Sequence, residues 1–150
     1  KMNAPELYLE NQLCFPLYAT SRLTTKIYAP YLEELGVTYP QYLVLLTLWQ
    51  YNDQSVTSIG KRLYLESNTL TPLLKRLEQK RLIVRSRSKT DERTVMITLT
   101  DAGKKLKKKA LEIPKKIIAS FEDDTITEEE MIFFQKTLFK LLNVLNDKTS

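Results

Sequence analysis

Residues 91–103 read DERTVMITLTDAG and contain, in thirteen positions, a charged turn, an alternating strand and the start of a helix. Val95, Ile97 and Leu99 alternate with threonine and methionine neighbours, which is the period of a half-buried strand. Thr100 follows, and threonine is a favourable N-cap for a helix. The stretch therefore predicts one strand of a β-hairpin that leads directly into a helix.

The turn before this strand carries charges suited to a nucleic-acid contact. We expect strands over residues 83–87 and 94–99, joined by a loop over residues 88–93. Arg93 lies at the tip, where a minor groove could admit its side chain, and Asp91 could hold the guanidinium by a charge-assisted hydrogen bond. The basic residues expected to reach phosphates and grooves from this hairpin are Arg85, Arg87, Lys89 and Arg93. The hairpin is thus predicted to be a DNA-binding wing.

A helix with two distinct faces precedes the hairpin, over residues 67–80. Its leucines recur at i, i+3, i+4 and i+7 and should face the core: Leu70, Leu73, Leu74 and Leu77. The opposite face is polar and cationic and contains Asn68, Thr71, Pro72, Lys75, Arg76 and Gln79. Because Pro72 has no N–H, we expect the helix to begin shortly before it, with Ser67 or Thr69 as its cap.

A shorter helix comes first, with Val56, Ile59 and Leu63 on one face and Gly60 allowing a close approach of a neighbouring backbone. Two helices joined by a short turn form a helix-turn-helix, whose second helix enters the major groove of DNA. The residues predicted to contact DNA are therefore Ser67, Asn68, Thr69, Thr71, Pro72, Lys75, Arg76, Gln79, Arg85, Arg87, Lys89, Asp91 and Arg93.

The remaining helices lie toward the two ends of the chain. The first should begin at Leu7 or Phe15, run to Tyr28 and continue briefly to Leu35, where a glycine C-cap ends it. Capping boxes at residues 38–41 (TYPQ) and 127–130 (TEEE) open an apolar helix over residues 42–51 and the last helix. Apolar stripes on the last two helices contain Leu106, Ile113, Ile117, Ile118, Met131, Phe134, Leu138, Leu141, Leu142 and Leu145. We interpret the terminal helices as a two-fold dimer interface that places two recognition helices about 34 to 36 Å apart on a pseudopalindrome.

Composition narrows the function further. Among 150 residues, 23 Lys and Arg outnumber 18 Asp and Glu, and the net charge of +5 favours an anionic partner such as nucleic acid. One cysteine and no histidine exclude an intrachain disulfide, a Cys/His zinc cluster and a Ser-His-Asp triad. We therefore expect no cofactor, no metal site and no enzymatic activity.

Targeting signals are also missing from the sequence. It contains no run of roughly 18 apolar residues that could cross a bilayer, and its first residues lack the basic start and apolar core of a signal peptide. We expect a cytoplasmic protein without a membrane partner. Lys1 precedes Met2, and we expect Met2 to be the natural start.

The single cysteine, Cys14, lies among apolar residues, where a cysteine is usually inert core. Two features favour a reactive thiol instead. Pro16 fits the first turn of a helix, which would put Cys14 near the positive end of the helix dipole, where a thiolate is favoured. The chain also has 8 tyrosines, and phenols can hydrogen-bond a thiolate.

The wing pattern D-x-R-x(5)-L-T-x-x-G is complete in residues 91–103 and resembles the signature of the MarR family of winged-helix regulators. Residues 9–15 (LENQLCF), 38–43 (TYPQYL) and 70–75 (LTPLLK) are similar to the organic-hydroperoxide-sensing repressors of the OhrR group, one-cysteine type. The resemblance covers nearly the whole chain. It implies a mainly α fold with a small β-hairpin wing, in one MarR-type domain over residues 1–150. Dimerisation helices would occupy about residues 1–36 and 104–150, and the winged helix-turn-helix about residues 37–103.

The same resemblance implies a redox input. Cys14 matches the peroxide-sensing thiol, and Tyr28 and Tyr39 match tyrosines that the other subunit donates to that thiol. Oxidation would begin with a sulfenic acid, proceed to a mixed disulfide with a small thiol or to over-oxidation, disturb the dimer and release DNA. A single cysteine cannot form a disulfide between two different cysteines, and a symmetric bridge between two Cys14 residues stays open. Asn68 stands where these regulators commonly have glycine, so we expect a different base preference.

Four hypotheses about function follow. The first is a homodimeric repressor that binds double-stranded DNA at a pseudopalindromic operator and responds to an organic hydroperoxide through Cys14. The second is a MarR-like repressor controlled by a small phenolic ligand, with Cys14 structural. Release of the operator by peroxide would support the first hypothesis, and release by an aromatic acid would support the second. The third is a thiol peroxidase, for which no resolving cysteine or nearby Arg or His activator is visible. The fourth is a dimerisation or adaptor protein, which would show no salt-dependent DNA binding.

Overall fold

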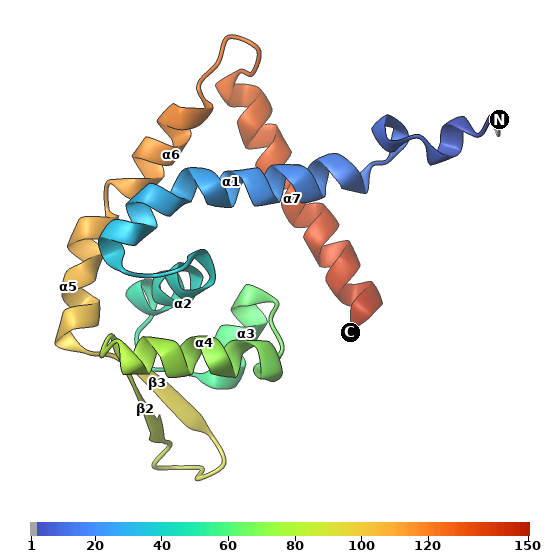
Figure 1. Ribbon diagram of the computed structural model, residues 1–150. Coiled ribbons are helices and arrows are strands. Elements are labelled where there is room, and N and C mark those ends of the chain that lie inside the picture. Colours follow the sequence, from blue (N-terminus) through green and yellow to red (C-terminus); the bar gives the residue numbers. More distant parts are fainter. Residues whose placement is uncertain (1–2) are drawn as a thin grey trace.

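The computed structural model describes residues 3–150, so the expectation about Met2 lies outside the described residues. In chain order the elements are the 3-10 turns η1 (Pro5–Leu7) and η2 (Leu9–Asn11), α1 (Cys14–Leu35), α2 (Tyr39–Gln50), β1 (Gln54–Ser55), α3 (Val56–Leu63), α4 (Ser67–Gln79), β2 (Ile83–Arg87), β3 (Val95–Leu99), α5 (Asp101–Ala110), α6 (Ile113–Phe121) and α7 (Glu128–Thr149). The predicted fold class, mainly α with a small hairpin wing, is confirmed (Figure 1).

The three strands form one antiparallel sheet in the order β1-β3-β2. β2 and β3 pair with Arg85 opposite Ile97 and Arg87 opposite Val95, which confirms the predicted hairpin. β1 adds Gln54 on the other side of β3, also opposite Ile97. This third strand was not expected, because two residues are too few to show an alternating pattern.

The core lies where α2, α3 and α4 meet the sheet. The side chains that are completely shielded there include Leu45, Ile59, Leu70, Ile97 and Val44. Burying one such side chain is worth about 1.5–3 kcal/mol, so this cluster supplies most of what holds the helix-turn-helix to the hairpin. In α6, Ile113 and Ile117 extend the same cluster.

The T-x-x-G part of the wing motif connects the hairpin to α5 by local physics. The Thr100 hydroxyl accepts a hydrogen bond from the Gly103 backbone N–H at 3.1 Å, which confirms the predicted N-cap. A Cβ on Gly103 would lie 2.2 Å from the Leu82 carbonyl oxygen, so only glycine fits against the turn that enters β2. The Trp49 indole donates to the Gly103 carbonyl at 2.9 Å and ties this junction to α2.

The start of α4 differs from the expectation. Its N-cap is Glu66, whose side chain makes no capping hydrogen bond, and neither Ser67 nor Thr69 is the cap. Pro72 lies inside the helix rather than in its first turn. The missing proline N–H leaves the Asn68 carbonyl without its helical donor, and the exposed position of both residues leaves that carbonyl open to water.

The other boundaries shift by a few residues. α1 begins at Cys14 and continues without a break to Leu35, where Gly36 in the left-handed conformation (φ 71°) ends it as predicted. α2 begins at Tyr39, directly after its N-cap Thr38, and the predicted capping box between Thr38 and Gln41 is present. The helix after the wing is divided into α5 and α6 by a turn before Pro114, a residue that favours the start of a new helix.

The two ends of the chain extend away from this core. Figure 1 shows the N-terminal half of α1 extending away from the helix-turn-helix, and α7 crossing α1 and running back to the level of α3. Within the described residues, α7 has no buried position, and Phe133 is 72 % exposed. Leu13, next to the start of α1, is 81 % exposed. Among residues 3–150, no helix is long and apolar enough to cross a membrane.

Candidate nucleic-acid interface and cysteine site

The helix pair α3–α4 is held by a close backbone contact. Ser55 caps α3 by accepting the Ser58 N–H, and Tyr64 ends it in the left-handed conformation (φ 58°). The Leu65 N–H then donates to the Gly60 carbonyl at 2.9 Å. A Cβ at position 60 would lie 2.8 Å from the Leu65 carbonyl oxygen, so glycine permits this turn and fixes the direction in which α4 leaves it.

The outer face of α4 is available to a ligand. Leu70, Leu74 and Leu77 are buried and Leu73 is partly buried, which confirms the predicted core face. The exposed residues among those predicted to contact DNA from this helix are Ser67, Asn68, Thr69, Pro72, Lys75, Arg76 and Gln79. Thr71 is half-buried, and its hydroxyl donates to the Ser67 carbonyl at 2.7 Å. A polar, cationic surface of one helix therefore faces solvent.

The wing tip is shaped mainly by Asp91. Its carboxylate accepts the Arg93 backbone N–H at 3.0 Å and the Thr94 hydroxyl at 3.3 Å, and its carbonyl accepts the Thr94 N–H at 2.9 Å. Arg93 Nε lies 3.7 Å from the carboxylate, beyond hydrogen-bond distance, and its side chain is 95 % exposed. Asp91 therefore pairs with the guanidinium as an ion pair and not through the expected hydrogen bond; it closes the turn through the backbone N–H, and the Arg93 side chain stays almost fully exposed.

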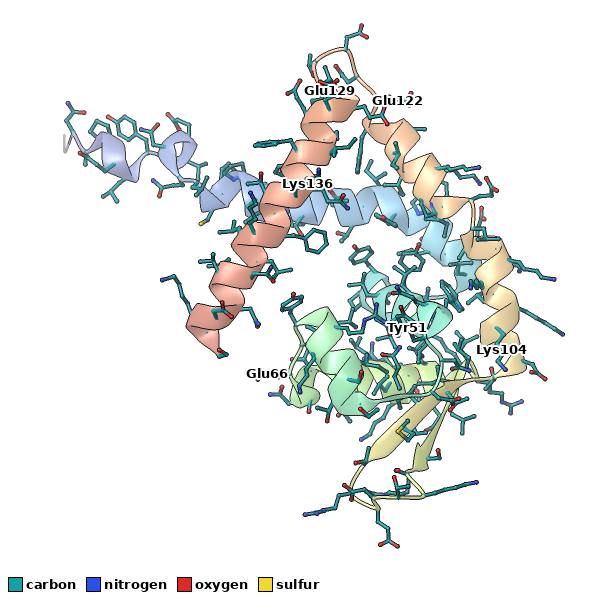
Figure 2. The ribbon with its side chains drawn as sticks, turned by 180° about the vertical axis from the view of Figure 1, so that it is seen from behind. Tyr51, Glu66, Lys104, Glu122, Glu129 and Lys136 are labelled. Atoms are coloured by element: carbon teal, nitrogen blue, oxygen red, sulfur yellow. The ribbon has the colours of Figure 1, made fainter. Side chains whose placement is uncertain are left out.

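The other basic wing residues differ in their freedom. Lys89 is exposed on the loop, whose side chains extend outward (Figure 2). The Arg87 guanidinium donates to the Glu92 carbonyl at 2.9 Å and stabilises the hairpin. The Arg85 guanidinium is bound to a glutamate of α4 (Glu78) and is only partly exposed. A cleft of about 310 Å³, lined by residues of α3, α4 and both strands, separates the wing from the helix pair.

Cys14 is the first residue of α1, and its side chain is exposed. Pro16 lies in the first turn, as predicted, and the N-cap, Leu13, provides no side-chain hydrogen bond. The segment before it is ordered by side chains: the Gln12 amide donates to the Glu6 and Tyr8 carbonyls, both at 2.8 Å. The thiol therefore lies at a helix N-terminus whose first N–H groups no side chain caps, a position that favours negative charge.

Tyr28 and Tyr39 lie together but far from Cys14 of the same chain. Their ring centroids are 5.0 Å apart, and Tyr42 is 5.9 Å from Tyr28. Burial, with the neighbouring phenols of Tyr39 and Tyr42, raises the pKa of Tyr28 to about 12, so it is a neutral hydrogen-bond donor at neutral pH. Cys14 and Tyr28 are fourteen positions apart in α1, about 21 Å at 1.5 Å per residue. One chain therefore cannot bring the thiol to these phenols.

Within residues 3–150, no group of three or more His, Cys, Asp or Glu side chains is arranged to hold a metal ion. The described site thus consists of an exposed cationic helix, a charged hairpin, an exposed thiol and a separate tyrosine cluster.

Comparison with known proteins agrees with this geometry. Residues 26–110 match the family described as transcriptional regulator SarA/Rot. The organic hydroperoxide resistance transcriptional regulator of Bacillus subtilis (strain 168) is 49 % identical over 140 residues, which are 93 % of each chain. The structure of reduced AbfR bound to DNA has a TM-score of 0.75 at 43 % identity and covers 96 % of this chain and 99 % of its own. The structure of disulfide-formed AbfR has a TM-score of 0.64 at 43 % identity, with coverages of 91 % and 92 %.

The fold and the exposed helix–hairpin surface define a winged-helix regulator of transcription. The chain belongs to the SarA/Rot family of MarR-type regulators, in the group that contains the organic hydroperoxide resistance regulators. The resemblance drawn from the wing motif and the N-terminal segments is therefore confirmed.

Proposed function

We propose that this protein is a homodimeric repressor that binds a pseudopalindromic operator and releases it when an organic hydroperoxide oxidises Cys14. The observation that carries the proposal is the separation of two groups: an exposed thiol at the start of α1, and a partly buried phenol pair formed by Tyr28 of α1 and Tyr39 of α2, too far from the thiol to meet it within one chain. Two antiparallel copies of α1 would bring each thiol to the tyrosines of the other chain.

Exposed apolar surface supports the dimer. Phe133, Phe139 and Leu13 are more than half exposed in a single chain. Apolar surface of this extent, clustered on the terminal helices, is typical of a protein–protein interface rather than of a monomer in water. A second copy of the same chain is the partner that a two-fold interface requires.

In the DNA complex, the exposed face of α4 would enter the major groove and Arg93 the minor groove. Asn68 and Thr71, near the start of the helix, would read base edges, whereas the exposed Lys75 and Arg76 would meet phosphates. Of the two wing arginines closest to the tip, Arg93 has the almost fully exposed side chain, whereas the Arg87 guanidinium donates to the Glu92 carbonyl. Because its partner is the chromosome, we infer a cytoplasmic regulator rather than an enzyme.

Oxidation of Cys14 by a hydroperoxide is a two-electron step. The Cys14 thiolate attacks the terminal peroxide oxygen, the O–O bond breaks, and the leaving alkoxide takes a proton to become an alcohol. Sulfur is oxidised to a sulfenic acid and the hydroperoxide is reduced. A small thiol then condenses with the sulfenic acid, releasing water and leaving a mixed disulfide. Tyr28 and Tyr39 of the partner subunit would stabilise the thiolate by hydrogen bonds before the attack.

The test compares DNA binding by reduced and cumene-hydroperoxide-treated protein while the mass of the Cys14 peptide is followed. The DNA is a duplex that the reduced protein selects from a random-sequence pool. We expect release to parallel the gain of oxygen or of a thiol adduct on Cys14. Release by an aromatic acid with Cys14 unmodified would favour the ligand-controlled regulator instead, and binding that persists after full oxidation would contradict the proposal.

A further inference from the structure

The ion pair between Glu78 and Arg85 connects α4 to the wing. The Glu78 carboxylate, in the last turn of α4, accepts the backbone N–H and the Nε–H of Arg85, both at 3.0 Å. Arg85 Nη2 lies 3.0 Å from the same carboxylate. These hydrogen bonds lower the pKa of Glu78, so the carboxylate is ionised at neutral pH. Three N–H groups of one strand residue thus converge on one helix side chain.

The position of Arg85 explains why this contact forms. β2 is an edge strand, so its outward N–H groups have no neighbouring strand, and Glu78 accepts one of them. Side chains alternate along a strand, which places Arg85 on the same side of β2 as the buried Ile83, the side that faces α4. Both side chains of the pair remain about one-third exposed (31 % and 36 %), so the contact lies at the rim and can be changed without opening the core.

The pair lies at the inner end of the wing. The turn between α4 and β2 is closed by Arg81 in the left-handed conformation (φ 61°) and by the Leu82 N–H, which donates to the Leu77 carbonyl at 3.1 Å. The cleft of about 310 Å³ is lined by Thr71 of α4, by Arg85 and by Arg93 of the loop. Glu78 therefore ties the last turn of α4 to β2 at the edge of the shared core, next to this cleft.

We propose that Glu78 is a positioning residue, which holds Arg85 and through it sets the angle between the recognition helix and the wing. Arg85 then serves DNA binding through Glu78 and not through a phosphate contact of its own. The inference rests on the proposed DNA interface, in which α4 and Arg93 enter two different grooves of one duplex. Fixing their relative orientation before binding avoids the cost of ordering the hairpin on the DNA.

The sign of one substitution separates this role from simple electrostatics. A carboxylate near DNA repels phosphates, so removing the charge of a bystander glutamate should strengthen binding. A positioning role predicts the opposite for Glu78→Gln. The neutral amide has one acceptor oxygen, and its NH2 group cannot accept from the Arg85 guanidinium.

The matched control is Glu66→Gln, which removes the same charge from the other end of the same helix. Glu66 is exposed and its side chain makes no capping hydrogen bond (Figure 2). With a duplex selected by the unmodified protein, we expect Glu78→Gln to weaken binding about 2- to 30-fold and Glu66→Gln to leave it unchanged or tighter. Arg85→Gln should weaken binding by a similar factor, and the double variant no further, because both substitutions break one contact.

Salt dependence tests the second half of the proposal. A lost phosphate contact lowers the slope of log K against log salt concentration by about 1. We expect Arg85→Gln to leave this slope unchanged. The inference would be overturned if Arg85→Gln reduced the slope and the losses of affinity in the two single variants added up in the double variant. It would also be overturned if Glu78→Gln bound DNA as tightly as Glu66→Gln.

A measurement without DNA checks the contact itself. In the free protein, hydrogen exchange at the Arg85 amide should be faster in Glu78→Gln, while amides paired between β2 and β3 keep their protection. An unchanged Arg85 amide would also overturn the inference. If the unmodified protein selects no duplex, the proposed function fails and the positioning role falls with it; if it binds and only the Glu78 result is contrary, the proposed function stands.

Discussion

The helix-turn-helix body (α2 to β3) and the arms (α7 and the first half of α1) differ in how far one chain completes them. In the body, Leu45, Leu70 and Ile97 are fully shielded from solvent. In the arms, Phe133 is 72 % and Leu13 is 81 % exposed. The surface proposed to read DNA is thus built within one chain, whereas the proposed sensing site would need two. A signal that changes how two chains meet can therefore alter DNA binding without unfolding the body.

The largest expected effect is on the free energy of unfolding, and it compares a substitution in the core of the body with one on an arm. Leu45→Ala should lower the free energy of unfolding by about 2–5 kcal/mol, because it leaves a cavity in a fully shielded cluster. Phe139→Ala, in α7, removes a ring that is 57 % exposed in one chain and should mainly weaken the dimer. Urea denaturation and sedimentation equilibrium measure the two effects. A dimer of unchanged affinity in Phe139→Ala would show that this face of α7 lies outside the interface.

The second prediction concerns the switch. An oxidised thiol adds volume where two chains pack, which commonly costs about 1 to 3 kcal/mol and is enough to shift a dimer between two arrangements. Serine keeps the size of cysteine but cannot form a sulfenic acid. Cys14→Ser should therefore bind DNA normally and remain bound after treatment with cumene hydroperoxide. A serine variant that peroxide releases as readily as the unmodified protein would show that Cys14 is not the switch.

The third prediction tests whether the body contacts DNA through Arg93, the exposed arginine of the wing. Arg93→Ala should weaken operator binding by about 1 to 3 kcal/mol, because the side chain is predicted to occupy a narrow minor groove. Glu92→Gln is the control: it alters the adjacent tip residue but keeps the Glu92 carbonyl that binds Arg87. Titrations at one salt concentration measure both. Equal affinities of Arg93→Ala and the unmodified protein would remove Arg93 from the interface.

The smallest expected effect concerns the rate of sensing. Tyr28→Phe and Tyr39→Phe each remove a phenol that would donate to the thiolate of the other chain, so DNA binding should persist while oxidation slows. Stopped-flow measurement of Cys14 oxidation gives the rate, and Tyr51→Phe, an exposed tyrosine outside the cluster, is the control. Equal oxidation rates in all variants would show that the tyrosine cluster does not act on the Cys14 thiol.

The same cluster predicts an alkaline limit to stability. The pKa of Tyr28 is raised to about 12 in the folded chain, above its ordinary value of 10.0, so folding favours the neutral phenol. The resulting stability is fully present below pH 10 and is lost as the pH rises toward 12. As the pH rises from 10 to 12, the free energy of unfolding should therefore fall less in Tyr28→Phe than in the unmodified protein, as measured by denaturation at each pH. A loss of the same size would assign the alkaline effect to other groups.

Much of the fold could be predicted because its signals are local. An N-cap hydroxyl accepts a backbone N–H only three residues further on, so Thr38, Thr100 and Thr127 marked three helix starts. Alternation predicted β3, and leucine spacing predicted the buried face of α4. The start of α4 was wrong because Pro72 suggested a first turn, whereas the buried leucines hold the helix two residues further back than Thr69. β1 was missed because its pairing with β3 joins distant segments.

The sequence by itself determined the family, the mainly helical fold with its wing, the exposed face of the recognition helix and the presence of one thiol at the start of a helix. Each follows from residues within a few positions of one another, where chain geometry fixes their relations. Only the tertiary structure decided that Glu78 binds Arg85 and that Tyr28 and Tyr39 meet far from Cys14. Those contacts depend on how helices and strands pack, and side-chain type alone does not specify which acceptor a donor reaches.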